Sequence, residues 1–264
     1  MVTKTALITG ASSGIGSATA RLLAQQNIHV VLVARRLQRL NALAQEIKQA
    51  GGSASVIQAD LTQEVERINV YEHVLADSGN LDILINNAGL GWYGYYADMP
   101  WDIALEVLQV NITAVAHLTN LFLPEMRARN SGHIINIGSI AGSFPNQGVA
   151  LYSASKSFLD SFTTVLHREL TGTRVECSVA RVGPVATEFF DQAAHRPAGF
   201  PIPAERFAIT AEEVAHRIWG LIERPRKVIY IPRALVVVPW VELLFGWLVD
   251  LLGPLLLKRA SADL

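Results

Sequence analysis

Short apolar runs alternate with longer segments of helical periodicity along most of the chain. The runs cover residues 5–9, 29–34, 54–59, 82–86, 133–138, 175–182 and 228–231. They are apolar throughout rather than at every second position, which is typical of parallel strands covered on both faces of a sheet. The intervening segments predict helices over residues 14–26, 36–49, 65–77, 100–129, 153–170 and 211–223. Repeated β–α units with right-handed crossovers predict an α/β fold: one doubly wound parallel sheet of about seven strands, with helices on both faces.

The bulk composition narrows the class of protein. The 264 residues carry 22 Lys and Arg against 23 Asp and Glu, a formal net charge of −1. This balance argues against nucleic acid or an anionic membrane surface as an electrostatic partner. The single cysteine, Cys177, lies in an apolar run, so we expect a buried structural thiol. The N-terminus leads almost directly into a strand, so we expect no signal peptide and a cytoplasmic location.

A glycine-rich turn, Thr9-Gly10-Ala11-Ser12-Ser13-Gly14-Ile15-Gly16, joins the first strand to the first helix. Unpaired N–H groups and the positive end of the helix dipole favour a pyrophosphate there. Glycines alone are a weak signal, because many turns need them for their conformation. Asp60 ends the third strand, where a carboxylate can accept from an adenine amino group. Asn86-Asn87-Ala88-Gly89 ends the fourth strand with small residues that let the backbone approach a ribose, so the sequence predicts a dinucleotide (Rossmann) site.

Tyr152 and Lys156 lie four residues apart in a predicted helix and therefore share one face. An ammonium close to a phenol lowers the phenol pKa from its usual value of about 10, and such a phenol can act as acid or base near neutral pH. Taken alone, a pair of this kind is usually solvated surface, and a lone serine such as Ser139 is usually a cap or turn residue. After a dinucleotide turn, the combination predicts hydride transfer to or from a carbonyl.

Together these motifs resemble the short-chain dehydrogenase/reductase family, in its single-domain branch. The resemblance covers roughly residues 3–232. It rests on landmarks that occur in the family order: the Thr9–Gly16 turn, Asp60-Leu61, Asn86-Asn87-Ala88-Gly89, Asn111, Ser139, Tyr152 with Lys156, and Gly183-Pro184-Val185-Ala186-Thr187. Val182 is a departure, because the family usually has proline before this last glycine. The departure removes no hydrogen-bonding group used in catalysis.

The resemblance implies an NAD(P)-dependent oxidoreductase that acts on CH–OH groups. It implies that Tyr152 is the general acid/base for the substrate oxygen, and that Lys156 holds the nicotinamide ribose and lowers the pKa of Tyr152. It also implies that Ser139 positions the carbonyl oxygen, that Asn111 holds a water linking Lys156 to solvent, and that no metal takes part. The residues expected to bind the cofactor are Gly10, Ser12, Ser13, Gly14, Ile15, Gly16, Arg35, Arg36, Asp60, Leu61, Asn87, Ala88, Gly89, Tyr152, Lys156, Gly183, Val185 and Thr187.

The end of the second predicted strand bears on the choice of cofactor. An NAD enzyme places an acid there to hold the ribose 2′-hydroxyl. This chain reads Val33-Ala34-Arg35-Arg36 and has no carboxylate until Glu46. Arginine binds a 2′-phosphate through a charge-assisted fork, so the sequence favours NADP(H) over NAD(H), held chiefly by Arg35. The alternative interpretation is that both arginines begin the next helix in solvent.

Aromatic residues dominate two segments expected near the substrate. Residues 90–96 include Trp92, and the segment after Thr187 includes Phe189. In the family this second segment is a mobile lid, here about residues 187–210. A pocket walled by Trp92 and Phe189, with Ser139 and Tyr152 at the reacting oxygen, suits an apolar ketone or alcohol. Packing of these aromatics on the domain or on a subunit partner is the alternative.

The chain ends in an apolar extension. We expect residues 1–232 to form the dinucleotide-binding and catalytic domain and residues 233–264 to form the extension. Residues 234–257 are apolar apart from Glu242 and Asp250, and two acids and two prolines disfavour a transmembrane span. Three placements stay open: on a membrane surface with Trp240 and Trp247 at the interface, against the lid, or in an oligomer interface. Family members are commonly homodimers or homotetramers.

Three functions follow from these observations. The leading one is an NADP(H)-dependent carbonyl reductase or alcohol dehydrogenase for a lipophilic small molecule. A 3-oxoacyl thioester reductase is a competitor, although the chain has no evident basic cluster near the lid beyond Arg196 and Arg206. A non-catalytic NADP(H)-binding sensor or scaffold is the alternative from another class. It is disfavoured because such relatives tend to lose the tyrosine or the lysine.

Overall fold

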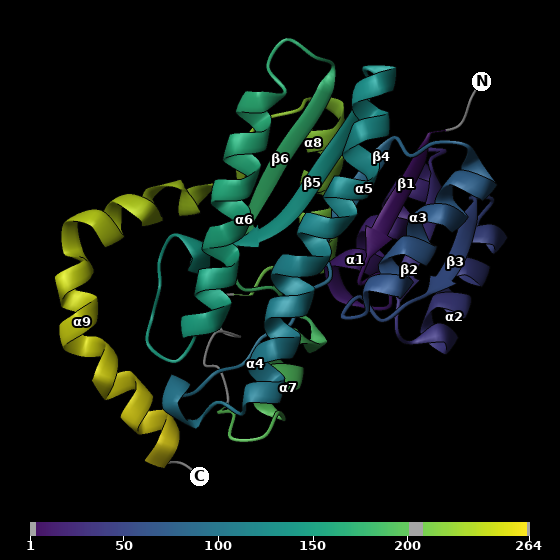
Figure 1. The fold of residues 1–264 in the computed structure, drawn as a ribbon. Helices are drawn as coiled ribbons and strands as arrows, with labels where there is room; N and C mark the ends of the chain where they lie inside the picture. Colours follow the sequence, from purple (N-terminus) through teal and green to yellow (C-terminus); the bar gives the residue numbers. More distant parts are fainter. Residues whose placement is uncertain (1–3, 201–207, 263–264) are drawn as a thin grey trace.

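Each apolar run of the sequence forms a strand of one parallel sheet (Figure 1). The computed structural model describes residues 4–200 and 208–262. Its strands are β1 (Thr5–Thr9), β2 (His29–Ala34), β3 (Ala54–Gln58), β4 (Ile83–Asn86), β5 (Gly132–Ser139), β6 (Val175–Val182) and β7 (Val228–Ile231). Their order is β3-β2-β1-β4-β5-β6-β7. The order reverses between β1 and β4, which in doubly wound sheets opens a crevice at the carboxyl ends of the strands. The predicted fold is confirmed.

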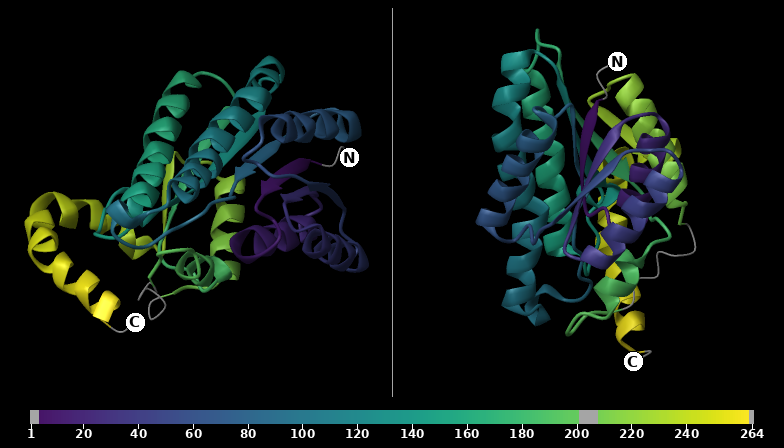
Figure 2. Two further views of the ribbon diagram at one scale, coloured as in Figure 1. Left: turned by 60° about the horizontal axis from the view of Figure 1, so that its bottom comes forward. Right: turned by 90° about the vertical axis from the view of Figure 1, so that its right-hand side faces the viewer.

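Helices cover both faces of the sheet (Figure 2). One face carries α1 (Gly14–Gln25), α2 (Leu37–Gln49) and α8 (Ala211–Glu223). The other carries α3 (Glu64–Ser78), α5 (Ala114–Arg129) and α6 (Ala150–Glu169). The remaining helical segments are η1 (Tyr96–Asp98), α4 (Trp101–Leu108), η2 (Gln109–Thr113), η3 (Ile140–Gly142), α7 (Glu188–Ala194), η5 (Arg233–Val237) and α9 (Val238–Ala262).

Alternating side chains of the strands, β7 excepted, enter two separate hydrophobic cores. Ile8 of β1 packs under the α1–α2–α8 face, whereas its neighbour Leu7 packs under the α3–α5–α6 face. Successive strand residues point to opposite faces, so a sheet covered twice needs apolar residues at every position. Cys177 is fully buried in the second core, which confirms the expected buried thiol.

The structure departs from the predicted helices at three places. The helix expected over residues 100–129 is divided into α4, a π turn (η2) and α5. The lid segment forms a helix, α7, that the sequence did not predict. The extension forms η5 and then the long helix α9, in which Pro239 falls in the first turn, where its missing N–H has no helical partner to lose. Residue 3, lid residues 201–207 with Arg206, and residues 263–264 lie outside the described residues.

α9 projects from the domain after β7 and arcs past α6 (Figure 1). Within residues 4–200 and 208–262, two helical stretches are long and apolar enough to cross a membrane by length and composition alone. Trp101–Arg129 is 44% buried over its most apolar window and forms part of the core. Arg233–Leu252 has a mean hydropathy of 2.0 and is 0% buried over the corresponding window. Among the described residues, nothing covers the outer surface of this second stretch.

Candidate active site

The ends of β1 and β4 are tied together beneath the glycine-rich turn. The Thr9 hydroxyl accepts hydrogen bonds from the main-chain N–H groups of Asn87 and Ala88, both at 3.0 Å. The turn itself requires glycine. Gly10 has φ +67° and Gly14 has φ +54°, and a Cβ at these positions would lie 2.9 Å from Ala88 Cα and from Thr187 Cγ2 respectively. This close-packed cradle at the start of α1 fits a pyrophosphate, which needs backbone N–H groups and no intervening side chain.

The groups expected to carry the chemistry meet at the ends of β5 and α6. Ser139 ends β5, and its hydroxyl lies beside the Tyr152 phenol. Lys156 donates from Nζ to the carbonyl oxygen of Ile137 at 2.8 Å, and Nζ lies 5.7 Å from the centre of the Tyr152 ring. Because this pair faces inward, the interpretation that the pair is solvated surface is wrong.

The electrostatics of this pair differ from the expectation. Burial raises the pKa of Tyr152, an effect that the hydrogen bond with Ser139 partly offsets by lowering it. Burial lowers the pKa of Lys156 to about 8, whereas Asp160 raises it. The pKa of Tyr152 therefore lies above its usual value overall, because desolvation of the phenol outweighs its favourable contacts.

Asn111 lies on the π turn η2 and acts within the protein rather than at the cavity surface. Its Oδ1 accepts from Leu90 N at 2.8 Å, and its Nδ2 donates to Leu90 O at 2.9 Å and to Ser155 Oγ at 3.0 Å. Both amide hydrogens are therefore committed to protein acceptors. The side chain braces the loop after β4 against α6, and a water can bind only to the second lone pair of Oδ1 or to the main chain.

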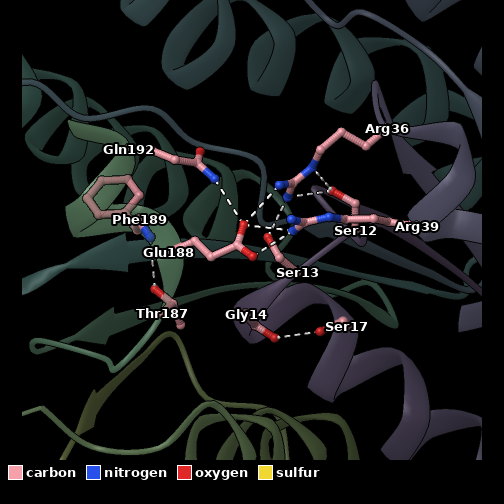
Figure 3. Close-up of polar contacts among 10 residues, drawn as sticks. All are labelled: Ser12, Ser13, Gly14, Ser17, Arg36, Arg39, Thr187, Glu188, Phe189 and Gln192. Carbon is pink, nitrogen blue, oxygen red and sulfur yellow. Dashed lines mark hydrogen bonds and ion pairs between the residues drawn. The ribbon is translucent and has the colours of Figure 1, made fainter. Parts of the chain in front are cut away.

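The two arginines after β2 point in different directions. Arg35 Nη1 pairs with Glu106 of α4 at 2.8 Å, and Glu106 also accepts from Arg196 at 2.9 Å. Arg36 instead lies on the glycine-rich turn, donating to the Ser12 and Ser13 hydroxyls at 2.7 to 3.1 Å (Figure 3). The structure thus places Arg36, rather than Arg35, against the turn.

One cavity of about 1450 Å³ gathers almost every predicted site residue. Of the predicted set, only Gly16 and Asn111 are absent from its lining, since Gly16 packs beneath the turn against Gly10. Asp60 reaches the lining, but its Oδ1 is already engaged by Thr62 N and Oγ1 at 3.0 and 2.9 Å. All four predicted substrate contacts are present in the wall: Ser139, Tyr152, Trp92 and Phe189.

The lid closes over the aromatic side of this cavity. Trp92 donates from Nε1 to Pro197 O at 3.1 Å, and the Phe189 ring lies 5.5 Å from the Tyr152 ring, centre to centre. Leu248, Val249 and Leu252 of α9 also line the cavity, and Gln147 donates to Val249 O at 3.2 Å. The sequence analysis missed these three residues, because only the path of α9 brings them to the site.

A sequence profile described as short chain dehydrogenase matches residues 4–198. The chain belongs to the short-chain dehydrogenase/reductase family. It is an oxidoreductase of that family, similar to a ketoacyl reductase of Nostoc, with 38% identity over 69% of this chain and 64% of the relative. A short-chain dehydrogenase from Sphingobium yanoikuyae in complex with NADPH superposes with a TM-score of 0.81, 29% identity and coverage of 91% and 92%. A family member from Burkholderia phymatum in complex with NAD superposes with a TM-score of 0.83 and 26% identity, over 91% of this chain and 92% of that structure.

Proposed function

We propose that this short-chain dehydrogenase/reductase interconverts a ketone or aldehyde and an alcohol on a lipophilic small molecule, with NADP(H) as cofactor. One observation carries the proposal: Tyr152, Ser139 and Lys156 share a cavity with the glycine-rich turn. Aromatic and aliphatic side chains make up much of the wall around them, including Trp92 and Phe189. A wall of this kind binds an apolar body, while the few polar groups fix the orientation of the reacting oxygen.

Each polar residue has a distinct task in this proposal. The bound nicotinamide supplies or accepts the hydride. Tyr152 gives its proton to the substrate oxygen during reduction and takes one during oxidation. Ser139 donates a hydrogen bond to the same oxygen and so holds the carbonyl in line. Lys156 binds the ribose hydroxyls, and its positive charge stabilises the phenolate that forms when Tyr152 loses its proton.

The preference for NADP(H) rests on Arg36 and on the lack of an acid at the end of β2. Structural relatives with NADPH and with NAD are both known, so the fold alone does not select the cofactor. The guanidinium of Arg36 lies at the Ser12 and Ser13 hydroxyls, where a 2′-phosphate can accept charge-assisted hydrogen bonds. Its contact with the glycine-rich turn makes Arg36 the better candidate than Arg35, whose guanidinium pairs with Glu106 of α4 instead.

A 3-oxoacyl thioester reductase is the second candidate, supported by the similarity to the Nostoc ketoacyl reductase. An acyl carrier or coenzyme A presents phosphates at the pocket entrance, and these need exposed cations. Arg196 of the lid segment is paired with Glu106. We therefore place the simple carbonyl substrate first.

The direct test is NADPH consumption by the purified full-length chain with a panel of ketones and acyl thioesters. The Tyr152→Phe variant is measured beside it, with Tyr93→Phe as the control because Tyr93 is another buried tyrosine of the cavity wall. We expect turnover to fall by at least about 100-fold in Tyr152→Phe with NADPH binding retained. Tight NADPH binding without turnover of any compound would favour the sensor, and turnover of thioesters alone would favour the second candidate.

We further propose that residues 233–264 form an extension that lies on a bilayer surface. One face of α9 carries an apolar stripe in which each side chain is 62–72% exposed: Trp240, Leu243, Leu244, Trp247 and Leu251. An α-helix turns by about 100° per residue. On this basis Glu242 lies about 150° around the helix from the centre of the stripe, and Asp250 lies at the edge of the stripe. An apolar stripe of this size rarely stays in water, and tryptophans favour the membrane interface.

The cavity gives a reason to prefer a bilayer over a second copy as the occupant. Leu252 is 51% exposed and also lines the cavity, so apolar surface continues from the outside of α9 to the pocket. A lipid phase at this face would supply a lipophilic substrate directly. The proposed homodimer or homotetramer would then use other surfaces, such as the α4 and α6 face, where Trp101 and Val165 are 66% and 49% exposed.

Flotation with neutral phosphatidylcholine vesicles tests this placement. The full-length chain is expected to float with the vesicles, and Leu243→Ser/Leu244→Ser is expected to float much less. Val65→Ser is the control, since Val65 is 67% exposed on α3. Two results together would contradict the proposal and assign this face to a second copy. The wild-type chain would fail to float with the vesicles, and gel filtration would show a wild-type dimer that the double substitution dissociates.

A further inference from the structure

Every side-chain nitrogen of Arg36 already donates a hydrogen bond (Figure 3). Nε and Nη2 donate to Ser12 and Ser13 of the glycine-rich turn. Nη1 donates to Glu188 Oε2 at 2.9 Å. A guanidinium has five N–H groups arranged as a planar fork. A phosphate that takes two parallel bonds from this fork must therefore displace at least one of these partners, and Glu188 is the only anion among them.

Glu188 is held by a second guanidinium as well. Arg39 Nη1 lies 2.6 Å from Oε1 and 2.8 Å from Oε2 of the same carboxylate. These two arginines hold the pKa of Glu188 below its usual value, so the carboxylate stays charged. The side chains of Glu188 and Arg36 are 43% and 38% exposed, which leaves the pair accessible to a ligand, and Arg36 also lines the cavity.

The same turn of helix that carries Glu188 also contacts the catalytic tyrosine. Glu188 begins α7, and Thr187 caps that helix by accepting from Phe189 N at 3.4 Å. The next side chain, Phe189, packs against the Tyr152 ring. Two consecutive lid residues thus contact the arginines near the glycine-rich turn and the Tyr152 phenol ring.

We infer that Glu188 determines cofactor selectivity and lid position by competing with the 2′-phosphate for Arg36. The inference rests on the proposed use of NADP(H). A phosphate monoester carries more negative charge than a carboxylate at neutral pH, so it can displace Glu188 from the Arg36 guanidinium. Glu188 then keeps only Arg39, and the first turn of α7 is released from the glycine-rich turn. NAD(H) has no group that can displace Glu188, so it leaves this contact in place.

Part of the binding free energy of NADP(H) is consequently used to break the Arg36–Glu188 pair. Exposed ion pairs contribute modestly to stability, and a pair with charge-assisted hydrogen-bond geometry lies at the upper end of that range. Removing the carboxylate charge should therefore tighten the binding of any ligand that carries the 2′-phosphate. It should leave ligands without that phosphate nearly unchanged.

The test compares Glu188→Gln with the wild-type chain in calorimetric titrations with NADP+ and NAD+. Adenosine 2′-phosphate and adenosine 5′-phosphate serve as fragments that need no turnover. Glu188→Gln is expected to lower the Kd for NADP+ and for adenosine 2′-phosphate by about 3- to 6-fold, with changes below 2-fold for the other two ligands. Glu46→Gln is the matched control, because it breaks an equally exposed pair, with Arg21, away from the cavity.

A second readout reports the lid. Amide hydrogen exchange within α7 is expected to be faster in Glu188→Gln than in the wild-type chain before nucleotide is added. An unchanged or weaker affinity of this variant for adenosine 2′-phosphate would overturn the inference, as would α7 exchange equal to that of the wild-type chain. If NADP+ and NAD+ bind the wild-type chain equally and Arg36→Ala affects neither, the proposed cofactor choice itself fails, which is a separate result.

Discussion

Lys156 donates a hydrogen bond of 2.8 Å to the carbonyl oxygen of Ile137, so the ammonium joins α6 to β5. One turn further along α6, Asp160 raises the pKa of this lysine against the stronger effect of burial. Asp160 is itself held by Arg181 Nε at 2.9 Å and by Ser143 Oγ at 3.3 Å. The charge state of Lys156 therefore depends on a carboxylate outside the cavity wall.

Replacing Asp160 by asparagine should shift the pH dependence of catalysis. The pKa of Lys156 is about 8, so the charged lysine that our mechanism needs is lost as the pH rises through that value. Without the carboxylate this pKa falls further, and the alkaline limb of kcat/KM moves to lower pH. The measurement is NADPH oxidation between about pH 6 and 9.5 with the preferred ketone.

Glu169→Gln provides the comparison for this experiment, because it removes an exposed carboxylate from the far end of α6. Its profile should match that of the wild-type chain. An alkaline limb that stays in place in Asp160→Asn, in protein shown to be folded by circular dichroism, would contradict the dependence on Asp160.

His133 should make the folded state sensitive to mild acid. Burial lowers the pKa of this histidine to about 4, and the ring contacts Ser178 Oγ at 2.8 Å. Between about pH 6.5 and 4, the unfolded chain binds a proton at His133 and the folded chain does not. The free energy of unfolding therefore decreases as the pH falls through this window, by up to about 1.4 kcal/mol per pH unit from this group.

Urea unfolding at pH 7 and pH 5 measures this effect. In His133→Gln, which retains a polar group for Ser178, the loss of stability between the two pH values should be smaller than in the wild-type chain. His73→Gln, at an exposed position on α3, should leave the loss unchanged. Equal losses in His133→Gln and the wild-type chain would show that other groups cause the acid sensitivity.

The thiol of Cys177 should be inert in the folded chain. Its side chain is 0% exposed, and burial raises its pKa to about 12. The thiolate is the reactive form, so a disulfide reagent at pH 8 should label no cysteine in the folded protein and one per chain in guanidinium chloride. Rapid labelling without denaturant would mean that β6 opens locally.

The sequence was sufficient to predict the sheet and the positions of most site residues. Runs such as residues 29–34 are too apolar for anything but a strand covered on both faces, and the parallel arrangement then brings Gly10, Asn87 and Ser139 to one edge. The sequence did not show which of two adjacent arginines contacts the glycine-rich turn. Arg35 and Arg36 look alike in sequence, but Glu106, 71 residues away, directs Arg35 off the glycine-rich turn.

The pKa of Tyr152 and the α9 contribution to the cavity were also beyond sequence reasoning. Motif spacing places Lys156 near the phenol, but it gives no measure of how far the pair is desolvated, and desolvation dominates here. Likewise, the apolar composition of residues 234–257 fits several placements. Only the course of the backbone after β7 shows that Leu248 and Val249 reach the cavity.

The π turn η2 implies a constraint on chain length as well as on residue type. A π turn accommodates one more residue than an α turn, and its five residues, Gln109–Thr113, include the one that braces Leu90 and Ser155. Deleting a single residue here would let α4 and α5 merge into one regular helix with both flanks close to their present orientation, and the widened turn that carries Asn111 would be lost. Asn111 could then no longer meet both partners. Insertions and deletions in this segment should therefore be far less tolerated than its plain helical sequence suggests.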